Sequence, residues 1–211
     1  MSLFPDFSNE DLFPTFAECP LKEALPGYTT ASTQYLLGTI GENMTLAQNP
    51  TFICKDRSGA SFALTLKLPR HMQKEGVRGG GLDFKQYKKG WTVVVRCPAR
   101  SGVKDGKQGF VESEVEESLV IPASLEKLAG MHNREWLSAA KGEVACQGCD
   151  EVKDRDELSR CKGCGAVWYC NKECQAKGWS EKDHKSECKA FKALKSPFLD
   201  PCRTQLEIKT V

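Results

Sequence analysis

Eight residues of metal-ligating type lie in the last third of the chain, grouped in four short pairs. The pairs are Cys146-x2-Cys149, Cys161-x2-Cys164, Cys170-x3-Cys174 and His184-x3-Cys188. Two or three intervening residues allow both donors of a pair to reach one ion, and zinc takes four sulfur or nitrogen donors in a tetrahedron. The four pairs therefore predict two tetrahedral zinc sites.

The local sequence indicates how each pair is presented. In the last two pairs the spacing of four residues places both donors on one face of a helix. In the first two pairs a glycine precedes the second cysteine, at Gly148 and Gly163, and we expect each glycine to provide a tight turn with positive φ. Eight ligands for two ions leave no position open for water or substrate, so we expect both zinc ions to be structural.

Eleven cysteines would also suit a disulfide framework in a secreted protein. The opening sequence, however, has neither the basic nor the apolar region of a signal peptide. No apolar run approaches the roughly 18 residues of a membrane span. We therefore predict a reduced protein of the cytoplasm, the nucleus or both, without contact to a membrane. The cysteines outside the four pairs are then free thiols, at positions Cys19, Cys54, Cys97 and Cys202.

The ligand order, with histidine seventh, fits neither a RING finger nor a LIM domain. Across residues 144–189 the chain resembles the MYND-type zinc finger family. The motifs that carry the resemblance are Trp168-Tyr169-Cys170, Cys174-Gln175, Trp179 and His184-x3-Cys188. The resemblance implies that the ligands interleave in two sets. One zinc would be held by Cys146, Cys149, Cys170 and Cys174, and the other by Cys161, Cys164, His184 and Cys188.

The resemblance also implies a shallow groove for proline-rich peptides of the type Pro-x-Leu-x-Pro, with Gln175 and Trp179 among its residues. An aromatic wall and one amide suit an extended ligand that is already ordered before it binds. Lys162 stands at the position that faces the peptide in the family, which favours acidic ligands. The alternative for Trp179 is that it only packs the small core of the finger. Gly178, and a longer segment before His184, depart from the family pattern and leave the start of the last helix open.

The remaining sequence predicts an α+β protein with a small five-stranded, OB-like β-barrel ahead of the finger. Residues 1–30 form an acidic, proline-punctuated arm that packs on the next domain or stays loose. The barrel covers residues 31–122, a connecting helix 123–142, the finger with its terminal helix 143–195 and a tail 196–211. The five strands, rich in β-branched and aromatic residues, are expected at 35–44, 51–55, 61–68, 91–97 and 109–113. Three strands, a connection and two further strands follow the order of an OB-fold.

The predicted barrel carries thirteen bases and four acids between Lys55 and Lys107, interleaved with aromatic residues. Such a surface could bind single-stranded nucleic acid, with bases stacked on the rings and lysines beside the phosphates. The opposing interpretation is that the rings form the core and the charges a solvated face. The aromatic residues concerned are Phe52, Phe62, Phe84, Tyr87 and Trp91.

Two function classes follow. The first is a non-catalytic adaptor that binds peptides through the finger, and its alternative is nucleic-acid binding through the barrel. A lysine methyltransferase is disfavoured, since nothing outside the finger supplies the long split SET domain that some relatives of this family carry. We therefore expect no enzyme. The tail holds Pro197, Leu199 and Pro201, itself a Pro-x-Leu-x-Pro match, which predicts an extended segment able to enter a groove of its own kind.

Overall fold

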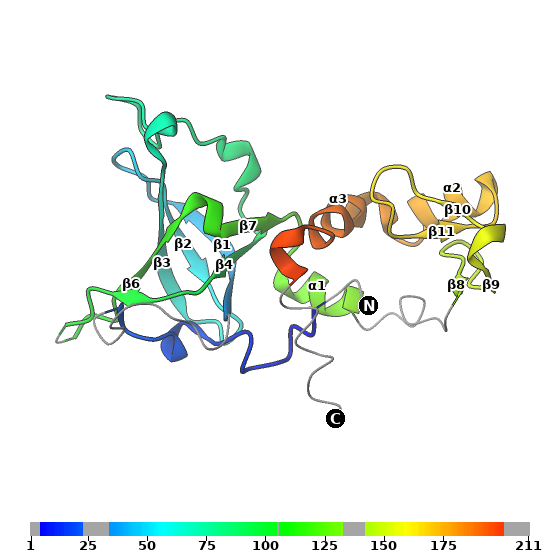
Figure 1. Ribbon diagram of the computed structural model, residues 1–211, viewed down its shortest axis with the longest axis horizontal. Helices are drawn as coiled ribbons and strands as arrows, with labels where there is room; N and C mark the ends of the chain where they lie inside the picture. Colours follow the sequence, from blue (N-terminus) through cyan, green and yellow to red (C-terminus); the bar gives the residue numbers. More distant parts are fainter. Residues whose placement is uncertain (1–4, 23–33, 105, 133–141, 201–211) are drawn as a thin grey trace. The chain divides into compact units, whose positions relative to one another are not determined.

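The computed structural model describes residues 5–22, 34–104, 106–132 and 142–200 (Figure 1). The chain divides into two compact units. We call Phe7–Leu125 the sheet unit and the other, which comprises Met1–Asp6 and Glu126–Val211, the finger unit. None of the helices in the described ranges is long and apolar enough to cross a membrane.

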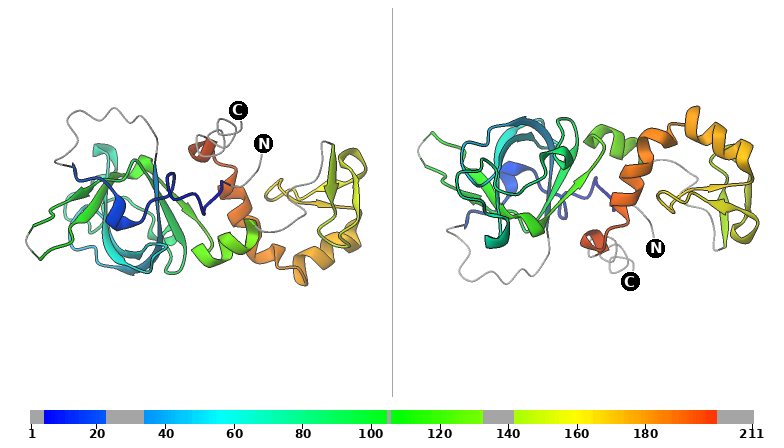
Figure 2. Two further views of the ribbon diagram at one scale, coloured as in Figure 1. Left: turned by 90° about the horizontal axis from the view of Figure 1, so that it is seen from below. Right: turned by 90° about the horizontal axis from the view of Figure 1, so that it is seen from above.

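The sheet unit holds seven strands, which form one curved mixed sheet (Figure 2). They are β1 Tyr35–Asn43, β2 Thr51–Lys55, β3 Ser61–Lys67, β4 Thr92–Arg96, β5 Arg100–Ser101, β6 Phe110–Glu114 and β7 Ser118–Ile121. Each of the five predicted strands is present, with ends within about one residue of the prediction. The short strands β5 and β7 were not predicted.

The sheet runs in the order β5-β6-β3-β2-β1-β4-β7. All its pairs are antiparallel except β3 with β6, which are parallel, with Leu64 opposite Val111. The order leaves β5 and β7 as edges, so no described pair closes the sheet into a barrel. The established fold is therefore a large sheet, three helices and a finger in an α+β chain, and the OB-like barrel stays a prediction.

Alternating residues of the strands form the core of the sheet unit. In β2 and β3, for example, Phe52, Cys54, Phe62 and Leu64 are all buried while their neighbours along the strand are less so. The rings of Phe84, Tyr87 and Trp91 are partly buried against the same cluster. All five aromatic residues that might have formed a stacking surface for bases thus belong to or pack on the core.

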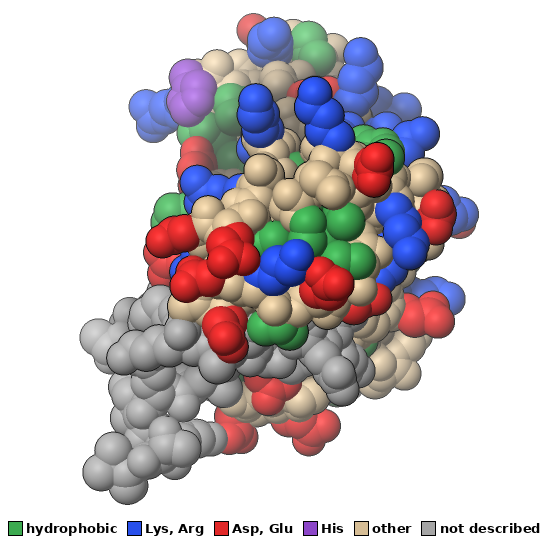
Figure 3. Space-filling view, turned by 90° about the vertical axis from the view of Figure 1, so that its right-hand side faces the viewer, with side chains coloured by type: hydrophobic (Ala, Val, Ile, Leu, Met, Phe, Trp, Pro, Cys, Tyr) green, Lys and Arg blue, Asp and Glu red, His purple; other side chains and the backbone are tan. Residues whose placement is uncertain are grey.

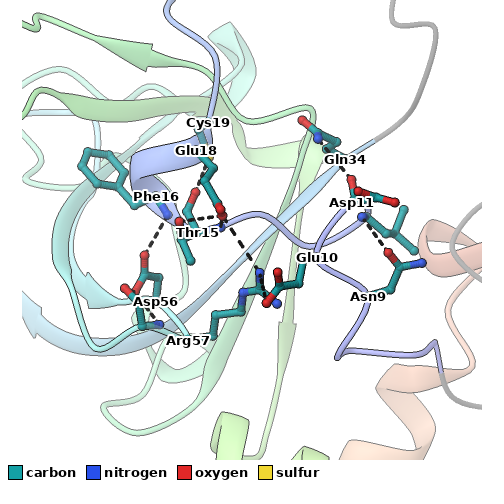
Figure 4. A network of polar contacts seen from close by, with 12 residues as sticks. Asn9, Glu10, Asp11, Thr15, Phe16, Glu18, Cys19, Gln34, Asp56 and Arg57 are labelled. Carbon is teal, nitrogen blue, oxygen red and sulfur yellow. Dashed lines mark hydrogen bonds and ion pairs between the residues drawn. The ribbon is translucent and has the colours of Figure 1, made fainter.

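The N-terminal arm packs on the sheet unit from Phe7 to Lys22, the described part of the predicted acidic arm (Figure 4). Its short 3-10 turn, Phe16–Glu18, begins after Thr15, whose hydroxyl and N–H both donate to the Glu18 carboxylate at 2.7 Å. The buried Asp56 accepts from the Phe16 N–H at 2.7 Å, and Arg57 reaches the Glu10 carboxylate at 3.3 Å. Of the two alternatives for the arm, packing is the one observed.

The finger unit consists of short elements around three helices. The helices are α1 Leu125–His132, α2 Lys172–Ser180 and α3 His184–Leu194, and the strands are β8 Glu143–Ala145, β9 Val152–Asp154, β10 Ser159–Arg160 and β11 Trp168–Tyr169. This unit also has 3-10 turns at Arg155–Glu157 and Pro197–Leu199. The sheet unit has further 3-10 turns at Arg70–Met72, Phe84–Gln86 and Val115–Glu117. The strands pair as β8 with β9 and β10 with β11, two antiparallel hairpins.

The described part of the predicted connecting helix is α1. The helix was expected over 123–142 with one apolar edge on the sheet unit. The described helix α1 ends at His132, residues 133–141 lie outside the described ranges, and the helix groups with the finger from Glu126 onward. The Lys127 ammonium lies 2.6 Å from the Ser186 hydroxyl and 3.6 Å from the Asp183 carboxylate on α3 and its N-cap. These contacts join α1 to α3 within the finger unit.

Candidate metal centres and adjoining groove

The first cluster brings together the first and third cysteine pairs. The ligand atoms of Cys146, Cys149, Cys170 and Cys174 all lie within 4.8 Å of one another. The Sγ atoms of Cys149 and Cys170 are 3.7 Å apart. The turn between β8 and β9 holds Cys146 and Cys149, and the turn between β10 and β11 holds Cys161 and Cys164; we call these two turns the knuckles. Cys170 follows β11 directly.

The second cluster consists of Cys161, Cys164, His184 and Cys188, whose ligand atoms likewise lie within 4.8 Å of one another. The Nε2 atom of His184 is 3.3 Å from the Cys161 Sγ and 3.7 Å from the Cys164 Sγ. The Sγ atoms of Cys161 and Cys188 are 3.9 Å apart. Cys161, Cys164 and His184 are buried, and Cys188 is partly exposed.

These separations fit two tetrahedral zinc sites. Bonds of about 2.3 Å to sulfur and 2.0–2.1 Å to nitrogen place tetrahedral ligand atoms about 3.8 Å apart for two sulfurs and about 3.6 Å for sulfur and nitrogen. The observed distances of 3.7 and 3.9 Å between sulfurs, and 3.3 and 3.7 Å to nitrogen, lie on either side of those values. A disulfide would require about 2.05 Å. The interleaved sets implied by the family resemblance are the sets that the fold assembles.

Backbone N–H groups favour the thiolate form that zinc requires. Burial opposes ionisation of the Cys146 thiol, but N–H groups including those of Cys149 and Gly148 lower its pKa to about 7. At Cys161 burial again opposes ionisation, and the N–H groups of Cys164 and Gly163 bring the net pKa shift downward. The backbone N–H groups therefore stabilise the thiolate form of the first cysteine in each knuckle, which is the form that binds a cation.

The expected role of Gly148 and Gly163 was wrong. Neither has a positive φ; the left-handed residue of each knuckle stands one place after the second cysteine, at Asp150 (φ 65°) and Gly165 (φ 62°). The two glycines are needed for space. A Cβ at Gly148 would lie 2.5 Å from the Cys174 carbonyl oxygen, and one at Gly163 would lie 2.9 Å from the Cys188 Sγ. Each knuckle therefore approaches its partner ligand too closely for any side chain.

The third pair also differs from its prediction. Cys170 and Cys174 were expected on one helix face, but α2 begins at Lys172, and Cys170 lies before the N-cap. Asn171 provides that cap, its side-chain oxygen accepting from the Cys174 N–H at 2.9 Å. The fourth pair lies within α3 as predicted, because that helix begins at His184 itself.

Packing explains the two departures from the family pattern. Gly178 is buried against Tyr169, where a Cβ would lie 2.6 Å from the ring. Despite the longer segment before α3, the Trp179 ring stands edge-on to the His184 ring, with centroids 5.5 Å apart. Tyr169 stands edge-on to the same imidazole at 6.1 Å, and its hydroxyl donates to the buried Gln147 at 2.7 Å. The aromatic rings therefore hold the zinc-binding histidine from two sides.

A groove of about 680 Å³ lies on the finger beside the second cluster. The three residues predicted to contact a peptide, Lys162, Gln175 and Trp179, all line it. The Trp179 ring is 40% exposed, so it packs on His184 with one part and faces solvent with another. The remaining lining residues are Ser159, Arg160, Cys161, Gly163, Tyr169, Asn171, Lys172 and Cys188.

A second hollow of about 650 Å³ adjoins the groove and was not predicted. It shares Arg160, Cys161, Lys162 and Gly163 with the groove, and Lys192 and Lys195 from the end of α3 complete it with Cys164 and Gly165. A signal for it existed in the sequence. Lys192 and Lys195 follow the ligand Cys188 by four and seven residues, a spacing that repeats on one helix face.

The tail was wrongly predicted to be extended in its described part. After α3, Pro197–Leu199 forms a 3-10 turn whose N-cap, Ser196, accepts from the Phe198 N–H at 3.3 Å. Leu199 is fully buried, and none of the described tail residues lines the groove. Proline ends the helix as expected, but the buried leucine is not available on the surface. Pro201, the last residue of the motif, lies outside the described ranges.

Two cysteines far from the clusters are free thiols, as predicted. Cys19 and Cys54 are buried, and burial raises the pKa of each to about 12. Cys97 is also free. Cys202 lies outside the described ranges.

Comparison with known proteins identifies the class of the finger. Residues 146–188, which hold all eight ligands, match the family model described as MYND finger. MYND fingers bind zinc and typically mediate contacts between proteins, and the two clusters fit the two zinc sites.

Similar segments occur in proteins of different named classes. The chain is 39% identical over 75 residues to a SET and MYND domain-containing protein of Dictyostelium discoideum, a match to 34% of this chain and 13% of that protein. It is 39% identical over 62 residues to the Arabidopsis thaliana histone-lysine N-methyltransferase ASHR1, covering 28% and 12%. An Arabidopsis F-box protein is 32% identical over 90 residues, covering 39% and 26%. The chain thus spans at most about a quarter of the length of these relatives.

Proposed function

We propose that this protein is a non-enzymatic adaptor whose finger binds proline-rich peptides of the Pro-x-Leu-x-Pro type. The observation that carries the proposal is the groove, lined by Trp179, Gln175 and Lys162 together. The indole supplies a partly exposed apolar wall, and the amide can bond to the carbonyl groups of an extended backbone. A proline-rich segment suits such a groove, because it loses little conformational entropy on binding.

The comparisons match only the finger and assign no activity to the whole chain. Finger-sized matches occur both in a named methyltransferase and in an F-box protein, and cover 12% and 26% of those chains. A segment shared by proteins with such different names does not by itself carry either activity. In the described chain, eight ligands for two ions also leave no coordination position for a substrate.

The tail of the chain is a poor ligand for this groove. Before a neighbouring molecule could bind it, the Pro197–Leu199 turn would have to open and Leu199 would have to leave the interior. Exposing a buried leucine side chain costs about 1.5–3 kcal/mol. We therefore propose that the groove serves other proteins.

We also propose that the sheet unit is a variant of the OB-like barrel. Strands β6 and β7 lie near opposite ends of the sheet order, yet only the three residues Val115–Glu117 separate them. At most about 3.6 Å per residue, that segment spans little more than 14 Å, so the sheet must curl until its two ends approach. The parallel pairing of β3 with β6 supports the same topology. Since the aromatic residues of this unit pack in its core, we assign it no nucleic acid.

Calorimetric titration of a neutral Pro-x-Leu-x-Pro peptide into the zinc-loaded full chain tests the function. We expect Trp179→Ala to weaken binding about 30-fold, the effect of removing a central aromatic anchor. Gln175→Ala should weaken it about fivefold, as the loss of one hydrogen bond does. The control is Val152→Ala, which changes an exposed apolar residue of the same finger outside the groove. Equal affinities for wild type and Trp179→Ala would contradict the proposal.

A further inference from the structure

The charged residues that line the two hollows beside the second metal centre are all basic. Among the charged residues that line them are Arg160, Lys162, Lys172, Lys192 and Lys195, and no aspartate or glutamate. The finger as a whole is nearly balanced, with eleven bases and ten acids over residues 143–195. The face that Figure 3 displays carries acidic as well as basic side chains. The exclusion of acids is thus a property of the hollows and does not follow from composition.

Charge compensation of the metal centre does not account for this excess. A zinc ion with three thiolates and a neutral imidazole carries one net negative charge. One lysine would balance it, whereas five basic side chains line the adjoining hollows. Lys195 is held in part, since its ammonium donates to the Gly165 carbonyl oxygen at 3.2 Å, and Arg160 lies over the Trp168 ring with its guanidinium 5.5 Å from the centroid. Several positive charges remain for a ligand.

The groove and the second hollow adjoin each other. They share Arg160, Cys161, Lys162 and Gly163, so a single extended chain can run from Trp179 to Lys192 and Lys195. We propose that the second hollow binds carboxylate side chains of the same peptide whose proline motif occupies the groove. The inference rests on the proposed function and specifies its ligand: a proline-rich segment with aspartate or glutamate on one flank.

The test uses calorimetry with three peptides on the zinc-loaded full chain. One is a neutral Pro-x-Leu-x-Pro peptide, and two carry a pair of glutamates before or after the motif. We expect one of the acidic peptides to bind about threefold to tenfold more tightly than the neutral one at low salt, as exposed charge pairs allow. The advantage should fall as ionic strength rises.

Paired substitutions locate the effect. Lys192→Gln with Lys195→Gln should reduce the ratio of acidic to neutral affinity to about one. Lys185→Gln with Lys189→Gln removes the same charge from exposed positions of α3 that line neither hollow, and should preserve the ratio. Measuring a ratio within each variant separates charge recognition from any general change in the finger.

The outcomes are distinguishable. If the neutral peptide binds through Trp179 and neither acidic peptide binds more tightly, the inference is wrong and the proposed function stands. If no peptide binds the zinc-loaded chain, the proposed function is wrong and the inference fails with it. If a single-stranded oligonucleotide binds more tightly than either acidic peptide, and the Lys192 and Lys195 substitutions remove that binding, the hollow serves nucleic acid and the inference is again wrong.

Discussion

Replacing Phe16 by alanine tests whether the N-terminal arm is part of the core of the sheet unit. The ring is 3% exposed and stacks on Phe62, with centroids 5.1 Å apart and planes 8° from parallel. The Arg100 guanidinium lies 5.6 Å from the centroid of the Phe16 ring. The bond from the Phe16 N–H to Asp56 involves only backbone on the arm's side, so it survives the substitution.

We expect Phe16→Ala to lower the free energy of unfolding of the sheet unit by about 3–4 kcal/mol. Truncation of a buried phenylalanine costs about 3–5 kcal/mol, including the cavity that remains. The stacked pair contributes about 0.5–1.5 kcal/mol of that amount. We choose the lower part of the range because an arm can partly collapse into the space, which reduces the cavity. Phe7→Ala removes a ring that is only half-buried and should cost about 1–2 kcal/mol.

Urea unfolding followed by resolved amide signals of strands β1 to β4 gives the stability of this unit alone. The zinc content of the variant serves as its control, because the substitution lies in the other unit from all eight ligands. A loss below about 1 kcal/mol with an unchanged denaturant dependence would refute the packing of the arm.

Three further predictions concern the metal centres and the thiols. Elemental analysis of protein purified without chelator should give two zinc ions per chain, and chelation should abolish the dispersed amide signals of the finger while those of the sheet unit persist. Gly148→Ala should weaken zinc binding about tenfold or more, since its Cβ would lie 2.5 Å from the Cys174 backbone. The control is Gly130→Ala, whose added Cβ would meet no atom of another element within 4 Å. It should leave zinc binding unchanged and stabilise α1 by about 0.5–1 kcal/mol. Cys19 and Cys54, whose pKa burial raises to about 12, should resist alkylation at pH 8 until urea unfolds the sheet unit, and rapid labelling of the native chain would contradict their burial.

The strands and ligands could be predicted because their signals are local. Runs such as Thr92–Arg96, three valines within five residues, indicate a buried strand without reference to the rest of the chain. Ligand spacing likewise fixes which cysteines can share an ion. The pairing of the four ligand pairs into two sets was not local information, and it came from the family resemblance.

The elements that the sequence did not reveal depend on distant contacts. Strand β5 has two residues, Arg100 and Ser101, and no periodicity can identify so short a segment; it exists because β6 pairs with it. Strand β7 follows a 3-10 turn with two glutamates and pairs with β4, a segment more than twenty residues earlier in the chain. The glycines of the knuckles were predicted to be necessary, but the reason, close approach of a ligand from another segment, could be seen only in three dimensions.

The groove and the second metal centre form one structure, which has a consequence for regulation by metal. Cys161 and Cys188, both ligands, also line the groove, and Trp179 packs on the ligand His184. Chelation of zinc should therefore abolish peptide binding completely, because it releases the three segments that form the walls. Calorimetry before chelation, after chelation and after one or two equivalents of zinc would measure this. We expect peptide binding to recover when zinc is added back to the wild-type chain. We expect no recovery in Cys161→Ser, which lacks a ligand of the second cluster. Peptide binding that survives in the metal-free chain would show that the groove does not depend on this centre.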